Sequence, residues 1–189
     1  VASELLNGNV RLFSNRLFNV GSPPDWSLNP INGERFEDSL LHWSRLSDFK
    51  SGVGDIKGVW ETSRFSWALI FARAYRLSGN RIYLDTLNQW VSDWTWKNPL
   101  NGGPNWKCGQ ESAIRMLNLM LAAFILEQDR SPVSGLIRFV KEHCARIALT
   151  IRYAISQDNN HGTSEAAALF IGGGWLKHHA ANNGELLEK

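Results

Sequence analysis

The residues best suited to chemistry are Asn160 and His161, in the run "DNNHGTSEAAALF". The alanine-rich stretch that follows predicts a helix, so the pair lies near the start of that helix. Free amides at a helix N-terminus, an Asn donor and an imidazole together suit the binding of a carboxylate. Such a site would serve proton abstraction beside a carboxylate, where negative charge grows in the transition state. His161 could also act as a general acid or base near neutral pH.

The same residues also fit an ordinary helix start. Asn, Gly, Thr and Ser favour N-terminal positions, and Glu165 would complement the helix dipole in the first turn. This interpretation explains much of the composition but does not require a histidine. Spacing alone leaves both interpretations open.

Two upstream clusters carry charged residues at helical spacing. Glu61 and Arg64 lie in "VWETSR", and Glu111 and Arg115 lie in "NWKCGQESAIR". Either pair could be an internal ion pair, worth a few tenths of a kcal/mol if exposed. The second pair falls on an otherwise apolar helix, where unpaired burial is costly, so its members should be paired or line a polar cavity. The expected substrate-binding residues are Glu61, Arg64, Trp106, Glu111, Arg115 and Glu165.

Helical periodicity dominates the chain from residue 36 onward. Apolar residues recur at steps of three and four, which predicts helices at about 61–77, 81–96, 108–128, 133–156 and after the Asn-His pair. No stretch shows sustained alternation with a period of two, so little or no sheet is expected. The predicted fold class is therefore all-α.

The domain organisation follows from turn residues and from a weak repeat. Residues 1–35 are punctuated by proline and glycine and are expected to form an irregular N-terminal arm. Residues 36–189 form the main domain, in which the three polar clusters recur about every 50 residues, the length of one helix hairpin with loops. That spacing matches stacked helical hairpins, as in an (α/α) toroid or solenoid. The three clusters would then converge on one cleft.

Composition excludes several classes of protein. The net charge is +2 with interspersed charges, which gives no argument for nucleic acid. The two cysteines are too few for a disulfide framework and lack zinc-site spacing, so no metal or cofactor is expected. No apolar run is long enough to span a membrane.

The nine Trp would by default fill helix contacts, although exposed ones suit stacking on sugar faces. No signal peptide precedes Val1, which says little about compartment.

Three motifs in order carry a family resemblance over roughly residues 40–176. They are "GVWETSRFSWALIFARAYRLSGNRIYLDTLNQWVSDW", "GPNWKCGQESAIRMLNLMLAAFIL" and "NNHGTSEAAALFIGG". Together they resemble the N-terminal region of the heparinase II/III family of polysaccharide lyases, in a bacterial subgroup associated with surface-polysaccharide gene clusters. The resemblance implies an α/α toroid followed by a β-sandwich. It also implies a periplasmic or secreted carbon-oxygen lyase that acts by β-elimination on uronic acids of an acidic polysaccharide.

The resemblance also implies site residues. Asn160 and His161 match the pair that neutralises the uronate carboxylate, and a tyrosine well downstream acts as base or acid. This chain has only Tyr75, Tyr83 and Tyr153, all upstream of the pair. We therefore expect an incomplete toroid that carries the carboxylate-binding half of the site and is inactive in isolation.

Two other functions remain open from the residues. One is an α/α-toroid glycoside hydrolase with Glu111 and Glu165 as its two carboxylates. The other is a non-catalytic glycan-binding or surface-polysaccharide assembly protein, which would bind saccharide without turnover.

Overall fold

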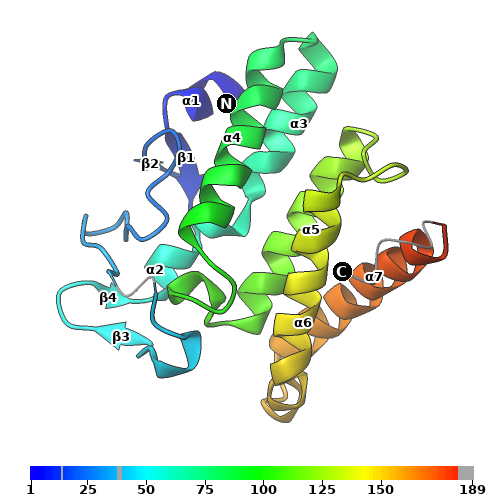
Figure 1. The fold of residues 1–189 in the computed structure, drawn as a ribbon. Helices are drawn as coiled ribbons and strands as arrows, with labels where there is room; N and C mark the ends of the chain where they lie inside the picture. Colours follow the sequence, from blue (N-terminus) through cyan, green and yellow to red (C-terminus); the bar gives the residue numbers. More distant parts are fainter. Residues whose placement is uncertain (14, 38–39, 183–189) are drawn as a thin grey trace.

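The computed structural model of the chain describes residues 1–13, 15–37 and 40–182. Within them the fold is mainly helical (Figure 1), with α1 (Ala2–Leu6), α2 (Lys57–Trp60), α3 (Ser66–Ser78), α4 (Arg81–Lys97), α5 (Gly109–Ile125), α6 (Ser134–Ser156) and α7 (Asn160–Asn182). Short 3-10 helices occur at η1 (Trp43–Arg45), η2 (Thr62–Arg64) and η3 (Pro104–Trp106). Two small antiparallel sheets pair β1 (Asn9–Leu12) with β2 (Arg16–Asn19) and β3 (Phe49–Lys50) with β4 (Gly54–Asp55).

The long helices pack as neighbouring hairpins. Helix α5 packs against both α3 and α7, while α4 packs on α3, and α6 packs on α5 and α7 (Figure 1). The polar clusters found in the sequence fall at α2–η2, at η3–α5 and at the start of α7. Each cluster therefore precedes or begins one helix of the row formed by α3, α5 and α7.

The helix expected at 61–77 is interrupted in the structure. Phe65 has a φ of 63° and separates η2 from α3. A left-handed conformation is unusual for a bulky residue, and no local sequence feature predicts it. Because the Phe65 ring is fully buried, its packing holds the backbone in this conformation. Because of this break, Arg64 lies at the end of η2 and outside α3.

Tryptophan side chains fill the core, in agreement with the default expectation. Five of them are almost completely buried: Trp26, Trp67, Trp90, Trp94 and Trp106. Trp67 and Trp90 meet edge to face with ring centroids 5.0 Å apart, an arrangement that aromatic pairs favour. The same cluster contains residues from α3, α4, α5 and α6, so it joins the hairpins into one core.

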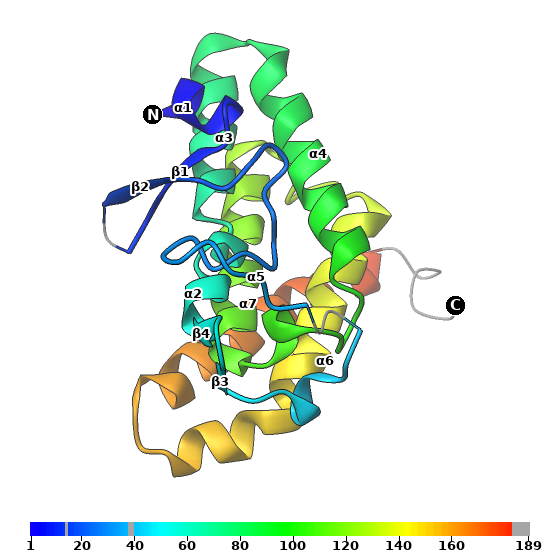
Figure 2. The ribbon, with the colours of Figure 1, turned by 90° about the vertical axis from the view of Figure 1, so that its left-hand side faces the viewer.

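The N-terminal segment is more ordered than an irregular arm. It contains α1 and the β1–β2 hairpin, and it lies over the side of the helical layer formed by α3 and α4 (Figure 2). Trp26 belongs to the main core, and its indole N–H donates to Asp93 Oδ2 of α4 at 2.7 Å. Apolar residues of this segment, such as Leu5 and Val10, are buried in that core. Tertiary burial therefore orders a segment whose local sequence favours turns.

Helix α7 begins at Asn160, so the Asn-His pair lies inside its first turn and not before it. The cap is the preceding residue, because Asn159 Oδ1 accepts from the His161 backbone N–H at 2.9 Å. Across the described part of the chain, each helix is too short or too polar to cross a lipid bilayer.

Candidate functional site

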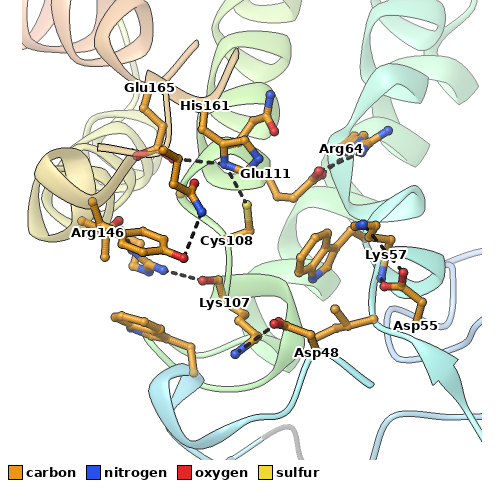
Figure 3. A pocket seen from close by; sticks show the side chains of 18 of the residues that line it. Asp48, Asp55, Lys57, Arg64, Lys107, Cys108, Glu111, Arg146, His161 and Glu165 are labelled. Carbon is orange, nitrogen blue, oxygen red and sulfur yellow. Dashed lines mark hydrogen bonds and ion pairs between the residues drawn. The ribbon is translucent and has the colours of Figure 1, made fainter. Parts of the chain in front are cut away.

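One pocket of about 600 Å³ collects residues from all three polar clusters. Arg64 reaches it from η2, Glu111 from the first turn of α5, and His161 and Glu165 from α7 (Figure 3). The convergence expected from the sequence is therefore observed. The volume is in the range of small-ligand sites.

His161 and Glu165 lie on the same face of α7, four residues apart. His161 Nδ1 is 3.8 Å from Glu165 Oε1, and it is also 4.0 Å from the Cys108 sulfur. The imidazole is half-buried, whereas the Glu165 side chain is only 3% exposed. Both side chains line the pocket (Figure 3), and the imidazole is the more accessible of the two.

Glu165 is the most perturbed acid of the site. Its Oε2 atom is buried without a hydrogen-bond partner among the described residues. Burial raises the pKa of Glu165 to about 7, although the charge of Arg146 acts in the opposite direction. A substantial fraction of this side chain is therefore neutral near pH 7 and can donate a proton.

Arg64 and Glu111 form a bidentate ion pair in the wall of the pocket. The Nε and Nη2 atoms of Arg64 donate to the two carboxylate oxygens of Glu111, each at 2.7 Å. Arg64 Nη1 also contacts Glu61. The hydrogen bond to Glu111 raises the pKa of Arg64 above its usual value. This fork geometry holds both side chains rigidly.

Arg146 on α6 is a buried cation that sequence reasoning missed. Its guanidinium donates to the carbonyls of Trp106 and Lys107, both at 2.7 Å, and to Thr150 Oγ1 at 3.0 Å. It also lies 3.8 Å from the centre of the Trp43 ring. Desolvation lowers its pKa to about 10, so it remains a cation at neutral pH. No carboxylate of the described residues lies within ion-pair distance of it.

A stripe along α6 could have revealed Arg146. Arg146, Thr150, Tyr153 and Gln157 are spaced by four, three and four residues, and all of them line the pocket. That spacing places them on one helical face. The Tyr153 hydroxyl accepts a hydrogen bond from Gln157 Nε2 at 2.9 Å. One of the tyrosines assigned to helix patterns thus also lies at the pocket.

Cys108 does not fit the role of a nucleophile. It is a free thiol at the N-cap of α5 and lines the pocket. Burial raises its pKa, and amide N–H groups of the first turn of α5 only partly oppose this shift. The sulfur is therefore held as a neutral thiol at physiological pH, whereas nucleophilic attack needs the thiolate.

Four of the expected site residues do not line the pocket. Arg115 is fully buried behind it, where it donates to His143 Nε2 at 3.0 Å and to the Asn105 carbonyl at 2.9 Å. Trp106 is a core residue, with its indole N–H bonded to the Asn98 carbonyl. The remaining two are Glu61, which reaches the site only through Arg64, and Asn160, which is exposed at the start of α7.

Arg115 and Glu111 are not paired with each other, contrary to one interpretation of their spacing. Glu111 bonds to Arg64, and Arg115 bonds to His143. Desolvation lowers the pKa of Arg115 to about 9. Desolvation also lowers the pKa of His143 well below its usual range, and the charge of Arg115 adds to this effect. His143 is therefore neutral and accepts at Nε2.

Charged pairs and aromatic rings complete the wall of the pocket. Lys107 Nζ lies 3.4 Å from Asp48, and Lys57 Nζ lies 3.8 Å from Asp55. Trp43, Phe49 and Trp60 also line it. Over the part of the chain that the structure describes, no group of three or more His, Cys, Asp or Glu side chains is arranged to hold a metal ion.

A second groove, of about 760 Å³, lies between the α3–α4 hairpin and the α5–α6 hairpin. Its lining contains none of the expected site residues. We therefore consider the smaller pocket the candidate site.

Comparisons of the chain with family models, with curated proteins and with solved structures find no match.

Proposed function

We propose that the pocket binds a uronic-acid-containing saccharide and that the domain belongs to a lyase that cleaves it by β-elimination. The observation that carries this proposal is the convergence of the three polar clusters on one pocket. There an imidazole, a buried acid and two guanidinium groups surround space for a sugar-sized ligand. The side-by-side packing of α3, α5 and α7 also supports the proposal that the helices are part of an (α/α) toroid.

The reaction needs an anion-binding group and a proton carrier. A base removes the proton next to the carboxylate, the glycosidic carbon–oxygen bond breaks, and the leaving oxygen takes up a proton. His161 would bind the carboxylate together with Arg146, which forms no ion pair with the carboxylates that the structure describes. The Tyr153 hydroxyl lies at the same pocket and is the candidate proton carrier of this chain. Asn160, being exposed, would contribute less than His161.

The test is the ultraviolet absorbance of an unsaturated uronate formed from acidic polysaccharides by the full-length protein. We expect His161→Ala to lower the rate at least a hundredfold, because general acid–base and charge-stabilising groups contribute on the order of that factor. His178→Ala is the control, since His178 is an exposed histidine of α7 that does not line the pocket. Undiminished activity of His161→Ala would contradict the proposal.

A glycoside hydrolase is the second candidate, and one observation favours it. Glu111 and Glu165 line the same pocket in contrasting environments, since Glu111 accepts two bonds from Arg64 and Glu165 Oε2 accepts none from the residues that the structure describes. Two carboxyl groups with contrasting environments are typical of acid and base roles in hydrolysis. Release of reducing ends without ultraviolet absorbance would indicate this activity. Saccharide binding without turnover at full length would indicate a glycan-binding or assembly protein instead.

A further inference from the structure

Glu165 is an ionisable group of the pocket that the proposed elimination does not use. Its side chain is almost fully buried, its Oε2 atom has no partner among the described residues, and it lines the pocket. A buried polar atom without a partner is costly and therefore rare. At a ligand pocket, such an atom leaves one hydrogen bond that a bound ligand can supply.

The carboxyl group is held in a fixed position. It packs against the backbone of Gly109 in the first turn of α5, where a Cβ atom would lie 2.7 Å from both carboxyl oxygens. Only a residue without a side chain allows this approach. The acid therefore lies beside the N-terminus of α5, whose positive end also attracts a ligand carboxylate.

We propose that Glu165 is a specificity-determining residue that, as a neutral acid, donates its O–H to the carboxylate of the bound saccharide. The carboxylate and Glu165 then share one proton beside His161 and the N-terminus of α5. Ionised Glu165 would repel the same ligand, so binding requires the protonated form. This inference rests on the proposed function only in taking the ligand to be a saccharide carboxylate.

The charged groups around Glu165 come from each helix packed against it. On α7 there is His161, and on α6 there is Arg146, whose charge favours ionisation of Glu165. The other titratable groups at the same pocket are Asp48, Asp55, Lys57, Arg64, Lys107, Cys108, Glu111 and Tyr153. Burial outweighs the charge of Arg146 and places the pKa of Glu165 at about 7. The neutral form thus predominates below pH 7 and is lost above it.

The experiment measures the Kd of sodium glucuronate by calorimetry at pH 6.0 and pH 8.5. For the wild type we expect binding to weaken about thirtyfold, because the apparent Kd scales inversely with the competent, protonated fraction. Glu165→Gln keeps a neutral donor that does not titrate, so its Kd should change less than about threefold over the same interval. Circular dichroism at both pH values establishes that each variant is folded.

Glu142→Gln is the matched control. Glu142 also has a pKa raised by burial, but it lies on α6 in the second groove. Its variant should keep the pH profile of the wild type. Identical profiles for wild type and Glu165→Gln, or no glucuronate binding at either pH, would overturn the inference.

The two proposals fail in distinguishable ways. A lyase signal together with pH-independent glucuronate binding would leave the proposed function standing and refute the role of Glu165. Glucuronate binding with the predicted pH profile, but no unsaturated product at full length, would leave the role of Glu165 standing and refute the lyase.

Discussion

Arg115 supports the pocket from behind without lining it. Its guanidinium is fully buried, lies 4.4 Å from the centre of the Trp94 ring and bonds to groups of η2, η3 and α6. A buried guanidinium that lost these bonds would leave several acceptors unsatisfied. We therefore assign it to the stability of the junction between the hairpins.

This assignment predicts that Arg115→Ala lowers the free energy of unfolding by about 3 kcal/mol or more, since breaking a buried charged network costs about that much. Urea unfolding at pH 7 measures the change. Arg130→Ala, at an exposed arginine, should lie within about 0.5 kcal/mol of the wild type. A fully stable Arg115→Ala protein with weakened saccharide binding would instead favour the substrate-binding role expected from the sequence.

Glu165 links the pocket to the pH dependence of stability. Its folded-state pKa is raised from 4.5 to about 7, so between those pH values the folded protein keeps a proton that the unfolded chain releases. The resulting stabilisation is full below about pH 4.5 and is lost as the pH rises through 7. The loss amounts to at most about 3 kcal/mol.

Urea unfolding of Glu165→Gln at pH 5 and pH 8 tests this link. The amide does not titrate, so the variant should gain stability relative to wild type by up to about 3 kcal/mol between the two pH values. Asp85→Asn, at an exposed carboxylate on α4, should show no such gain. A constant difference between Glu165→Gln and wild type would contradict the assigned environment.

Among the secondary-structure elements, the packing of α7 depends on one of three consecutive glycines. A Cβ atom at Gly172 would lie 2.7 Å from the Cys144 sulfur and 2.9 Å from Met116 Cε, whereas one at Gly173 or Gly174 would meet no atom of the described residues within 4 Å. The run therefore combines one close contact with α5 and α6 and two open positions. Close approach explains only the first glycine.

The three alanine substitutions should separate these roles. Gly172→Ala is expected to cost about 1–3 kcal/mol through overpacking. Gly173→Ala and Gly174→Ala should each stabilise by up to about 1 kcal/mol, because alanine favours a helix over glycine. Thermal unfolding of the three variants gives the comparison, and equal effects at all three positions would refute it.

At the scale of the whole molecule, the N-terminal segment and the helices share one core. Val20 and Trp26 belong to the cluster that joins α3, α4, α5 and α6. The backbone of this segment is also tied internally, since Val20 N–H donates to the Gly8 carbonyl and Asp25 N–H to the Val20 carbonyl. A segment that contributes large buried side chains should not unfold separately.

Hydrogen exchange tests this cooperativity. The amides of Val20 and Asp25 should exchange with the same opening free energy as buried amides of α5, because they open only on global unfolding. Trp26→Ala should lower the opening free energies of the N-terminal amides and of the α5 amides together, by about 3–5 kcal/mol. This is the usual cost of removing a buried aromatic side chain. Faster exchange of the N-terminal amides alone would show a separate unit.

The helical character of the chain was determined by the sequence alone, because it depends on local spacing. Helices α4, α5 and α6 lie close to their expected bounds, since apolar residues at steps of three and four mark a buried face directly. The polar stripe from Arg146 to Gln157 has the same helical spacing, but this rule for apolar residues does not indicate that it lines a pocket. The recurrence of polar clusters at the starts of α3, α5 and α7 likewise indicated that the clusters meet.

Only the tertiary structure decided which charged groups meet. Arg64 and Glu111 pair although they lie 47 positions apart in the sequence. Arg115, four residues after Glu111, instead donates to His143 and Asn105 in the core. Long-range packing also overrides local preference elsewhere. It holds Phe65 in a left-handed conformation, and it buries Leu5, Val10 and Trp26 of the N-terminal segment. Local periodicity specifies which face of a helix is buried, but the partner of each buried charge is set by how the helices pack.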